Sequence, residues 1–115
     1  MKNRDVRVYL EDILDSIRKI KEYTQTKSED EFFENYQLQD SVIRRLEIIG
    51  EAVKHIPDDF KDKYPDVAWR DIADTRNVLI HEYFGVKIDR VWKIIRHDIF
   101  DLEERIKQIK LKLEL

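Results

Sequence analysis

Residues 69–84 read WRDIADTRNVLIHEYF, a stretch whose apolar residues recur at helical spacing. At 100° per residue, five of these apolar residues fall within one arc of roughly 120° around a helix axis. They are Trp69, Ile72, Ala73, Leu79 and Ile80. The pattern predicts an amphipathic helix from Trp69 to Phe84, with one face turned toward a core.

Other segments repeat this helical pattern. We expect long helices over residues 5–23 and 38–56, and a last helix that opens at Asp89. Ser28 and Glu31 have the spacing of a capping box, which predicts a brief helix in the first connector. Residues 57–65 form an acidic, aromatic connector, and Asp66 is placed to cap the helix that begins near Trp69. Gly50 lies inside the second helix, where it is either a tolerated weak point or a place where another helix passes close by. The sequence therefore predicts an all-α, antiparallel bundle of four to five helices.

Composition narrows the class of protein. A length of 115 residues fits one domain, residues 1–115, and the scarcity of Gly (2) and Pro (2) is typical of helices. The absence of Cys excludes disulfides and favours a cytoplasmic location. No signal peptide or membrane span is recognisable, so we expect a soluble protein that does not bind membranes. The net charge of -3 predicts that any RNA is bound over a small footprint.

Arg76 projects near the centre of the apolar arc, where a leucine would be expected. An unpaired buried guanidinium costs several kcal/mol, so Arg76 must meet a carboxylate or open into a cleft. We expect Asn77, His81 and Tyr83 to lie with it on one rim. The alternative is a satisfied core arginine with ordinary helix-end residues nearby, and spacing alone does not separate the two.

His81 and Arg76 suit the cleavage of RNA by attack of a ribose 2′-OH on the adjacent phosphate. A histidine titrates near neutral pH and can take the proton, and a guanidinium matches two phosphate oxygens. Asn77 could orient His81 or bind a ribose hydroxyl. His55, His81 and His97 form no i, i+4 pair with one another, so we expect no metal site and no cofactor.

Asp98 is a candidate supporting residue on the last predicted helix. In regular α geometry it projects within roughly 40° of Val91, Ile95 and Leu102, on the apolar face. It is either the counter-charge to Arg76 or a sign that the last helix turns differently toward the core.

The order Arg76, four residues, His81, one residue, Tyr83 resembles the signature of HepT-like HEPN proteins. Residues 46–52 (LEIIGEA), Pro65 followed by Trp69-Arg70, and Val91-Trp92 are also similar to that family. The resemblance implies a HEPN-type bundle that homodimerises, with two copies of the motif about a shared cleft. It also implies a metal-independent ribonuclease.

The resemblance further implies that the protein is the toxin of a bacterial toxin–antitoxin pair. The antitoxin would be an MntA-like minimal nucleotidyltransferase that attaches AMP to Tyr83. One alternative is a non-catalytic helical subunit that binds such an enzyme and presents its substrate. Another is a plain helical dimerisation module, which leaves Arg76 on the core face unexplained.

Overall fold

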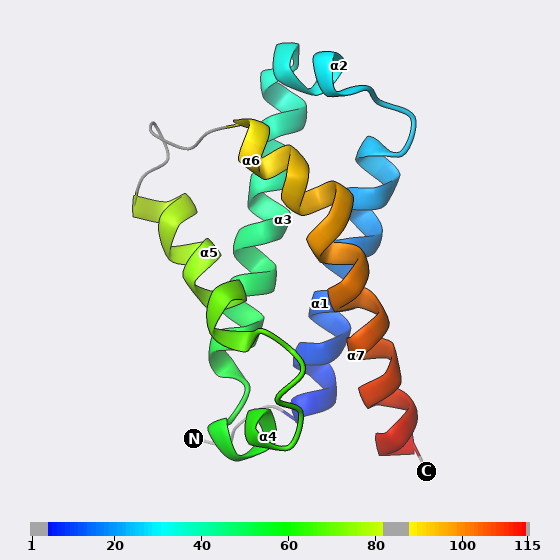
Figure 1. Cartoon of the computed structure of the whole chain (residues 1–115), viewed down its shortest axis with the longest axis vertical. Helices are drawn as coiled ribbons and strands as arrows, with labels where there is room; N and C mark the ends of the chain where they lie inside the picture. The colour runs from blue at the N-terminus through cyan, green and yellow to red at the C-terminus, as the bar shows by residue number, and fades with distance from the viewer. Residues whose placement is uncertain (1–4, 82–87, 115) are drawn as a thin grey trace.

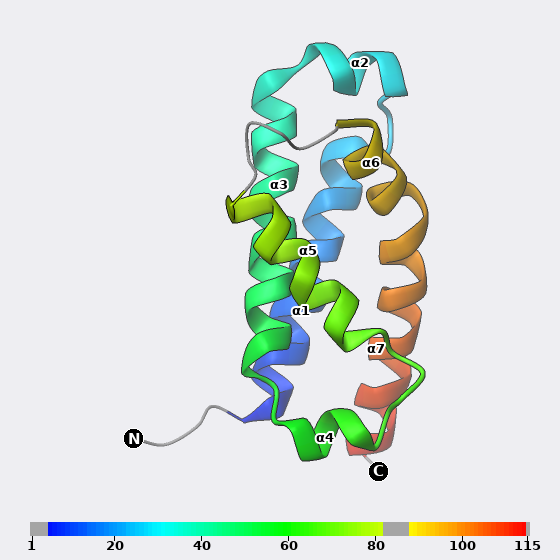
Figure 2. The same cartoon turned by 60° about the vertical axis from the view of Figure 1, so that its left-hand side comes forward.

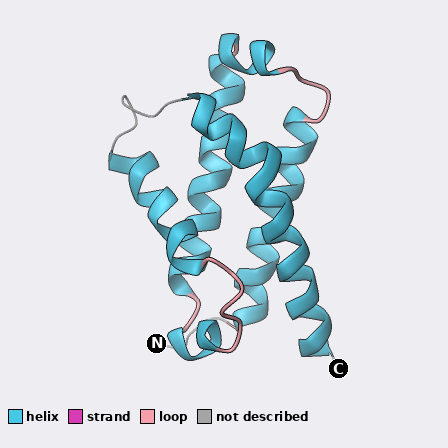
Figure 3. Cartoon of the chain, viewed as in Figure 1, coloured by secondary structure: helices cyan, strands magenta, loops and turns pink. Residues whose placement is uncertain are grey.

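The computed structural model is an all-α bundle that describes residues 5–81 and 88–114, with backbone only for residues 76–81 (Figure 1). Its long helices are α1 (Val6–Thr24), α3 (Tyr36–His55), α5 (Trp69–His81) and α7 (Ile99–Glu114). Its short helices are α2 (Glu29–Glu34), α4 (Asp58–Asp62) and α6 (Ile88–Lys93). The described residues contain no strand (Figure 3), and the predicted all-α fold is confirmed.

Helix α3 is the central element of the bundle, because it packs against both α1 and α5. The long helices run in alternating directions, and Figure 2 shows α5 crossing obliquely between α3 and α7. Apolar side chains from the long helices form one core, with no exposed surface left on Leu10, Ile13, Ile17, Ile20, Val42, Val53 and Ile106. Each such side chain contributes about 1.5–3 kcal/mol through burial, which makes this core the main source of stability.

Local capping sets where the first helices begin. The Asp5 side chain accepts a hydrogen bond from the Arg7 backbone N–H at 2.9 Å and opens α1. The predicted capping box is confirmed at α2: Glu31 N–H donates to Ser28 Oγ at 3.1 Å, and Ser28 N–H donates to Glu31 Oε1 at 3.2 Å. Asn35 caps α3 with a single bond, in which its Oδ1 accepts from Leu38 N–H at 3.0 Å.

The segment between α3 and α5 differs from its prediction in two respects. Helix α4 forms directly after Pro57, whereas we expected a connector without a helix there. Ala68, not Asp66, is the residue before α5, and its carbonyl accepts from Ile72 N–H at 3.1 Å. The Oδ2 atom of Asp66 instead lies 4.0 Å from Nη1 of Arg105. Gly50 is buried in α3, which agrees with the predicted close approach of another helix.

A π-helical turn, Ile94–Asp98, separates α6 from α7 and was not predicted. Such a turn inserts one residue into the helical repeat, so the residues after it rotate relative to the stripe before it. Ile99 is 3% exposed and takes the core position, while Asp98 is exposed. The prediction that Asp98 lies on the apolar stripe is therefore wrong. The helix thus faces the core differently from a regular α-helix, while the pairing of Asp98 with Arg76 stays a prediction.

Within the part of the chain that the structure describes, no helix combines the length and apolar character needed to cross a bilayer.

Candidate functional site

Three residues of the predicted motif follow one another along the second half of α5. Arg76, Asn77 and His81 lie on its described backbone, and their side chains lie outside the described residues. Tyr83 lies outside the described residues altogether. The predicted meeting of these four side chains on one rim thus stays a prediction, and the structure describes the surroundings of their helix.

The first half of α5 is firmly attached to the bundle. The Trp69 ring is 7% exposed, and its Nε1–H donates to the Tyr64 backbone oxygen at 3.0 Å. Ile72 and Ala73 are half-buried against the core. The predicted apolar face is confirmed for these residues, and it fixes the direction in which α5 leads to Arg76.

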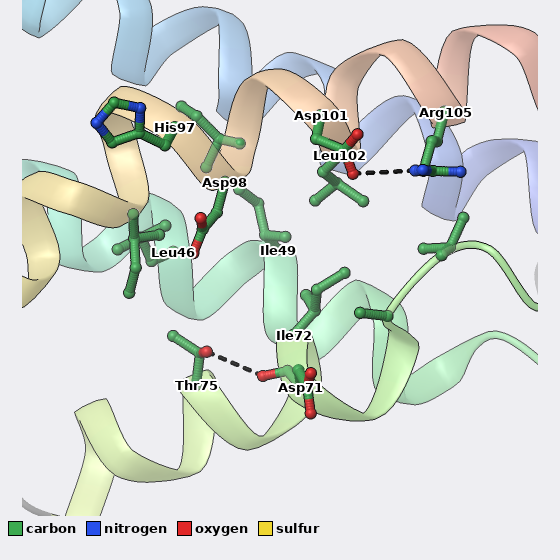
Figure 4. Close-up of a pocket in the computed structure, with 14 residues that line it drawn as sticks. Leu46, Ile49, Asp71, Ile72, Thr75, His97, Asp98, Asp101, Leu102 and Arg105 are labelled. Carbon is green, nitrogen blue, oxygen red and sulfur yellow. Dashed lines mark hydrogen bonds and ion pairs between the residues drawn. The ribbon is translucent and has the colours of Figure 1, made fainter.

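A cavity of about 480 Å³ opens between α5, α3 and the segment formed by the π-helical turn and α7 (Figure 4). We call it the α5–α7 cavity. Its walls are aliphatic, from Leu46, Ile49, Ile72, Ile94, Ile99 and Leu102. Thr75 also lines it and directly precedes Arg76 in the chain. The cavity therefore lies beside the helix that carries the motif.

Carboxylates predominate among the charged groups of the α5–α7 cavity. Asp71, Asp98 and Asp101 line it together with Arg105, whose Nε donates to Asp101 Oδ2 at 2.9 Å. Asp98 has no hydrogen bond or ion pair with any described residue. In Figure 4 its carboxylate points toward Leu46. A counter-charge role for Asp98 toward Arg76 stays a prediction, because that side chain lies outside the described residues.

Arg96 ties the π-helical turn to the end of α1, a contact that was not predicted from the sequence. Its Nη2 donates to the backbone oxygens of Thr24 and Lys27, both at 2.7 Å. The guanidinium also lies 4.2 Å from the centre of the Trp92 ring, which in turn contacts Phe32 at 5.2 Å. The i, i+4 spacing of Trp92 and Arg96 was the available signal for this stacked pair.

The histidines outside the motif have surface positions. His55 and His97 are both exposed, and His97 also lines the α5–α7 cavity. His55 Nε2 lies 3.0 Å from Glu51 Oε1, and its ring stacks on Tyr9 with centroids 5.8 Å apart. Among the side chains that the structure describes, no three His, Asp or Glu gather closely enough to hold a metal ion.

A family model described as ribonuclease HepT-like matches residues 13–109, a range that contains α3, the whole of α5 and the predicted motif. The chain belongs to the HepT-like ribonuclease family. This confirms the resemblance seen in the motif and in residues 46–52, and the helical bundle described above is its HEPN-type fold. No solved structure shows significant similarity to the chain.

Curated relatives of this HepT-like chain carry ribonuclease names. It is 43% identical to a protein of Thermococcus cleftensis named "Probable ribonuclease HepT", over 89% of this chain and 93% of the relative. It is 44% identical to a "Putative RNase" of Methanocaldococcus jannaschii, over 96% and 94% of the two chains. A third relative, from the same organism, is named "Gamma-glutamylcyclotransferase and putative RNase". It is 47% identical over 96% of this chain, which spans only 50% of that protein.

Proposed function

We propose that this HepT-like chain is a metal-independent endoribonuclease whose catalytic residues are Arg76 and His81. The observation that carries the proposal is their place five residues apart on α5, a helix anchored to α3, in a chain of a ribonuclease family. Asn77 and Asp98 are the proposed supporting residues. Asn77 would orient the His81 ring or bind a ribose hydroxyl. Asp98 would be a supporting carboxylate that faces α5 across the cavity.

The reaction requires one proton acceptor and one cation. His81 takes the proton of the ribose 2′-OH while that oxygen attacks phosphorus, and the bond from phosphorus to the 5′-oxygen breaks. The leaving 5′-oxygen takes a proton from solvent water, and a 2′,3′-cyclic phosphate remains on the other fragment. Arg76 stabilises the negative charge that builds on the phosphorane oxygens.

A homodimer would reconcile RNA binding with the acidic composition. Two copies of α5 placed about a shared cleft would bring two Arg76 residues near one phosphate. That arrangement produces a local positive potential in a chain whose net charge is -3. It also fits an RNA contact of small footprint, since few phosphates need to be bound.

The proposed biological role is that of a cytoplasmic toxin in a toxin–antitoxin pair. An MntA-like nucleotidyltransferase would silence it by attaching AMP to Tyr83, two residues after His81. The added phosphate would pair with the Arg76 guanidinium in place of the RNA phosphate. Inhibition would then need no unfolding of the bundle.

The test is cleavage of RNA by the purified chain in the presence of EDTA. Arg76→Ala and His81→Ala should each abolish cleavage and keep the helical circular dichroism of the parent. His55→Ala is the matched control, because His55 is an exposed histidine on another helix, and it should cut at the parental rate. Cleavage at the parental rate by both motif variants would show that the site is elsewhere.

A further inference from the structure

We infer that the α5–α7 cavity binds a nucleobase of the RNA, and that the Asp98 carboxylate selects guanine there. The inference rests on the proposed ribonuclease function and gives that function a sequence preference.

The cavity has the dimensions and walls of a site for a small flat ligand. Its volume of about 480 Å³ falls within the roughly 300–1,000 Å³ of small-molecule sites. Such sites are mostly apolar and contain a few polar groups that orient the ligand. Here the aliphatic side chains come from three segments, so they can cover both faces of a ring. An unstacked base of single-stranded RNA has this shape.

The charged groups described in the cavity disfavour a phosphate as its ligand. Three carboxylates line it, Arg105 is already bound to one of them, Asp101, and the other basic side chain among the described lining residues is the exposed His97. Since the carboxylates outnumber these two basic groups, a phosphate placed there would meet net repulsion. A neutral ring with N–H donors would meet no such repulsion.

The Asp98 carboxylate offers two acceptor oxygens, and the described residues leave both without a hydrogen bond. Guanine presents two adjacent donors, N1–H and the N2 amino group, which match the two oxygens of one carboxylate. Cytosine and adenine present a single amino group beside a ring acceptor. Uracil presents one N–H between two carbonyls. Only guanine therefore forms two parallel charge-assisted hydrogen bonds with Asp98.

A second copy of the chain is a poorer occupant of this cavity. In a two-fold symmetric contact the same surface meets itself. If the two-fold axis passed through this cavity, Asp71 and Asp98 of one copy would approach those of the other, and like charges in an interface are repulsive. Thr75, on the wall of the cavity, directly precedes Arg76. A base bound here would thus lie beside the helix that carries the proposed phosphate-binding arginine.

The test is binding of a short single-stranded RNA, 2′-O-methylated throughout so that it cannot be cleaved. One version contains a single guanosine, and the other contains inosine, which lacks only the N2 amino group. Fluorescence anisotropy should show the guanosine RNA bound at least about fivefold more tightly, because inosine loses one of two charge-assisted hydrogen bonds. Asp98→Asn should remove this difference. Asp89→Asn, an equal change of charge at an exposed position outside the cavity, should keep it.

Methyl NMR would show where on the chain the guanosine RNA binds. The guanosine RNA should shift the methyl signals of Leu46, Ile49 and Leu102 in the parent chain, and these shifts should be smaller in Asp98→Asn. Equal affinity for guanosine and inosine would overturn the inference. So would an equal loss of affinity for both RNAs in Asp98→Asn, which indicates a general electrostatic role, or unchanged cavity methyls. If the chain cuts RNA but shows no preference for guanosine, only this inference is overturned. If it binds guanosine in the cavity but does not cut RNA, only the proposed function is overturned.

Discussion

The Arg96 guanidinium donates a hydrogen bond to the backbone oxygen of Thr24 at 2.7 Å, across 72 residues of sequence. Thr24 is the last residue of α1, and the last carbonyls of a helix have no partner within it. Arg96 supplies one, binds the Lys27 carbonyl as well, and adds its positive charge at the negative end of the helix dipole. The end of α1 and the π-helical turn are thereby held together.

Arg96→Ala should lower the free energy of unfolding by about 2–4 kcal/mol. The variant loses two charge-assisted hydrogen bonds in a half-buried place and the stacking on Trp92. The free energy of unfolding of Arg96→Lys should lie between those of Arg96→Ala and the parent, because an ammonium can reach a carbonyl but lacks the planar stacking surface. Urea denaturation gives all three values.

Arg90→Ala is the control for that series, because Arg90 is an exposed arginine on the neighbouring α6. It should change the free energy of unfolding by less than about 0.5 kcal/mol. Equal urea midpoints for Arg96→Ala and Arg90→Ala would mean that the contacts of Arg96 contribute nothing to stability.

A second prediction concerns the register that the π-helical turn imposes on α7. Ile99→Ala should destabilise the chain by about 2–5 kcal/mol, because Ile99 is 3% exposed in the core. Asp98→Ala, one residue earlier, should stay within about 0.5 kcal/mol of the parent, since Asp98 is exposed. Thermal unfolding compares the two. The opposite ranking would indicate a regular α-helix through this segment, with Asp98 on its apolar stripe.

The sequence predicted the parts of the fold that depend on local signals. The first two long helices were placed within a residue or two at each end, because single caps and Pro57 mark those boundaries. The Ser28 and Glu31 capping box was found for the same reason. Helix α4 was missed, since five residues are too few to show a period.

The π-helical turn could not be found from the apolar periodicity, because a helical period of 100° per residue presumes a regular α-helix. The apolar residues before and after the turn both fit an α-helix, and only their relative rotation changes. Arg96 was missed because its partners are backbone oxygens far away in sequence. The identities of Arg76 and His81 pointed to the chemistry, whereas the cavity beside the first half of α5 depends on three segments that sequence alone does not bring together.

A third prediction is that the chain is a homodimer in solution. Light scattering at micromolar concentration should report about 28 kDa, twice the chain mass of 14.1 kDa. Two opposed copies of Arg76 would supply the positive charge that one acidic chain lacks. A mass near that of one chain at every concentration would remove this explanation of phosphate binding.

The last prediction concerns Tyr83 as the site of regulation by a nucleotidyltransferase partner. Incubation of the chain with that partner and ATP should add AMP, seen as a mass increase of the intact protein. In Tyr83→Phe the increase should vanish, because the phenolic oxygen that attacks the α-phosphate of ATP, with release of pyrophosphate, is absent. Tyr36→Phe is the matched control: Tyr36 is 77% exposed at the start of α3, so its loss should leave the modification unchanged. Tyr83→Phe should also cleave RNA like the parent and continue to do so after incubation with the partner and ATP, since no added phosphate would occupy Arg76. Persistent AMP on Tyr83→Phe would assign the modification to another residue, and loss of modification without escape from inhibition would show that the partner silences the nuclease by binding alone.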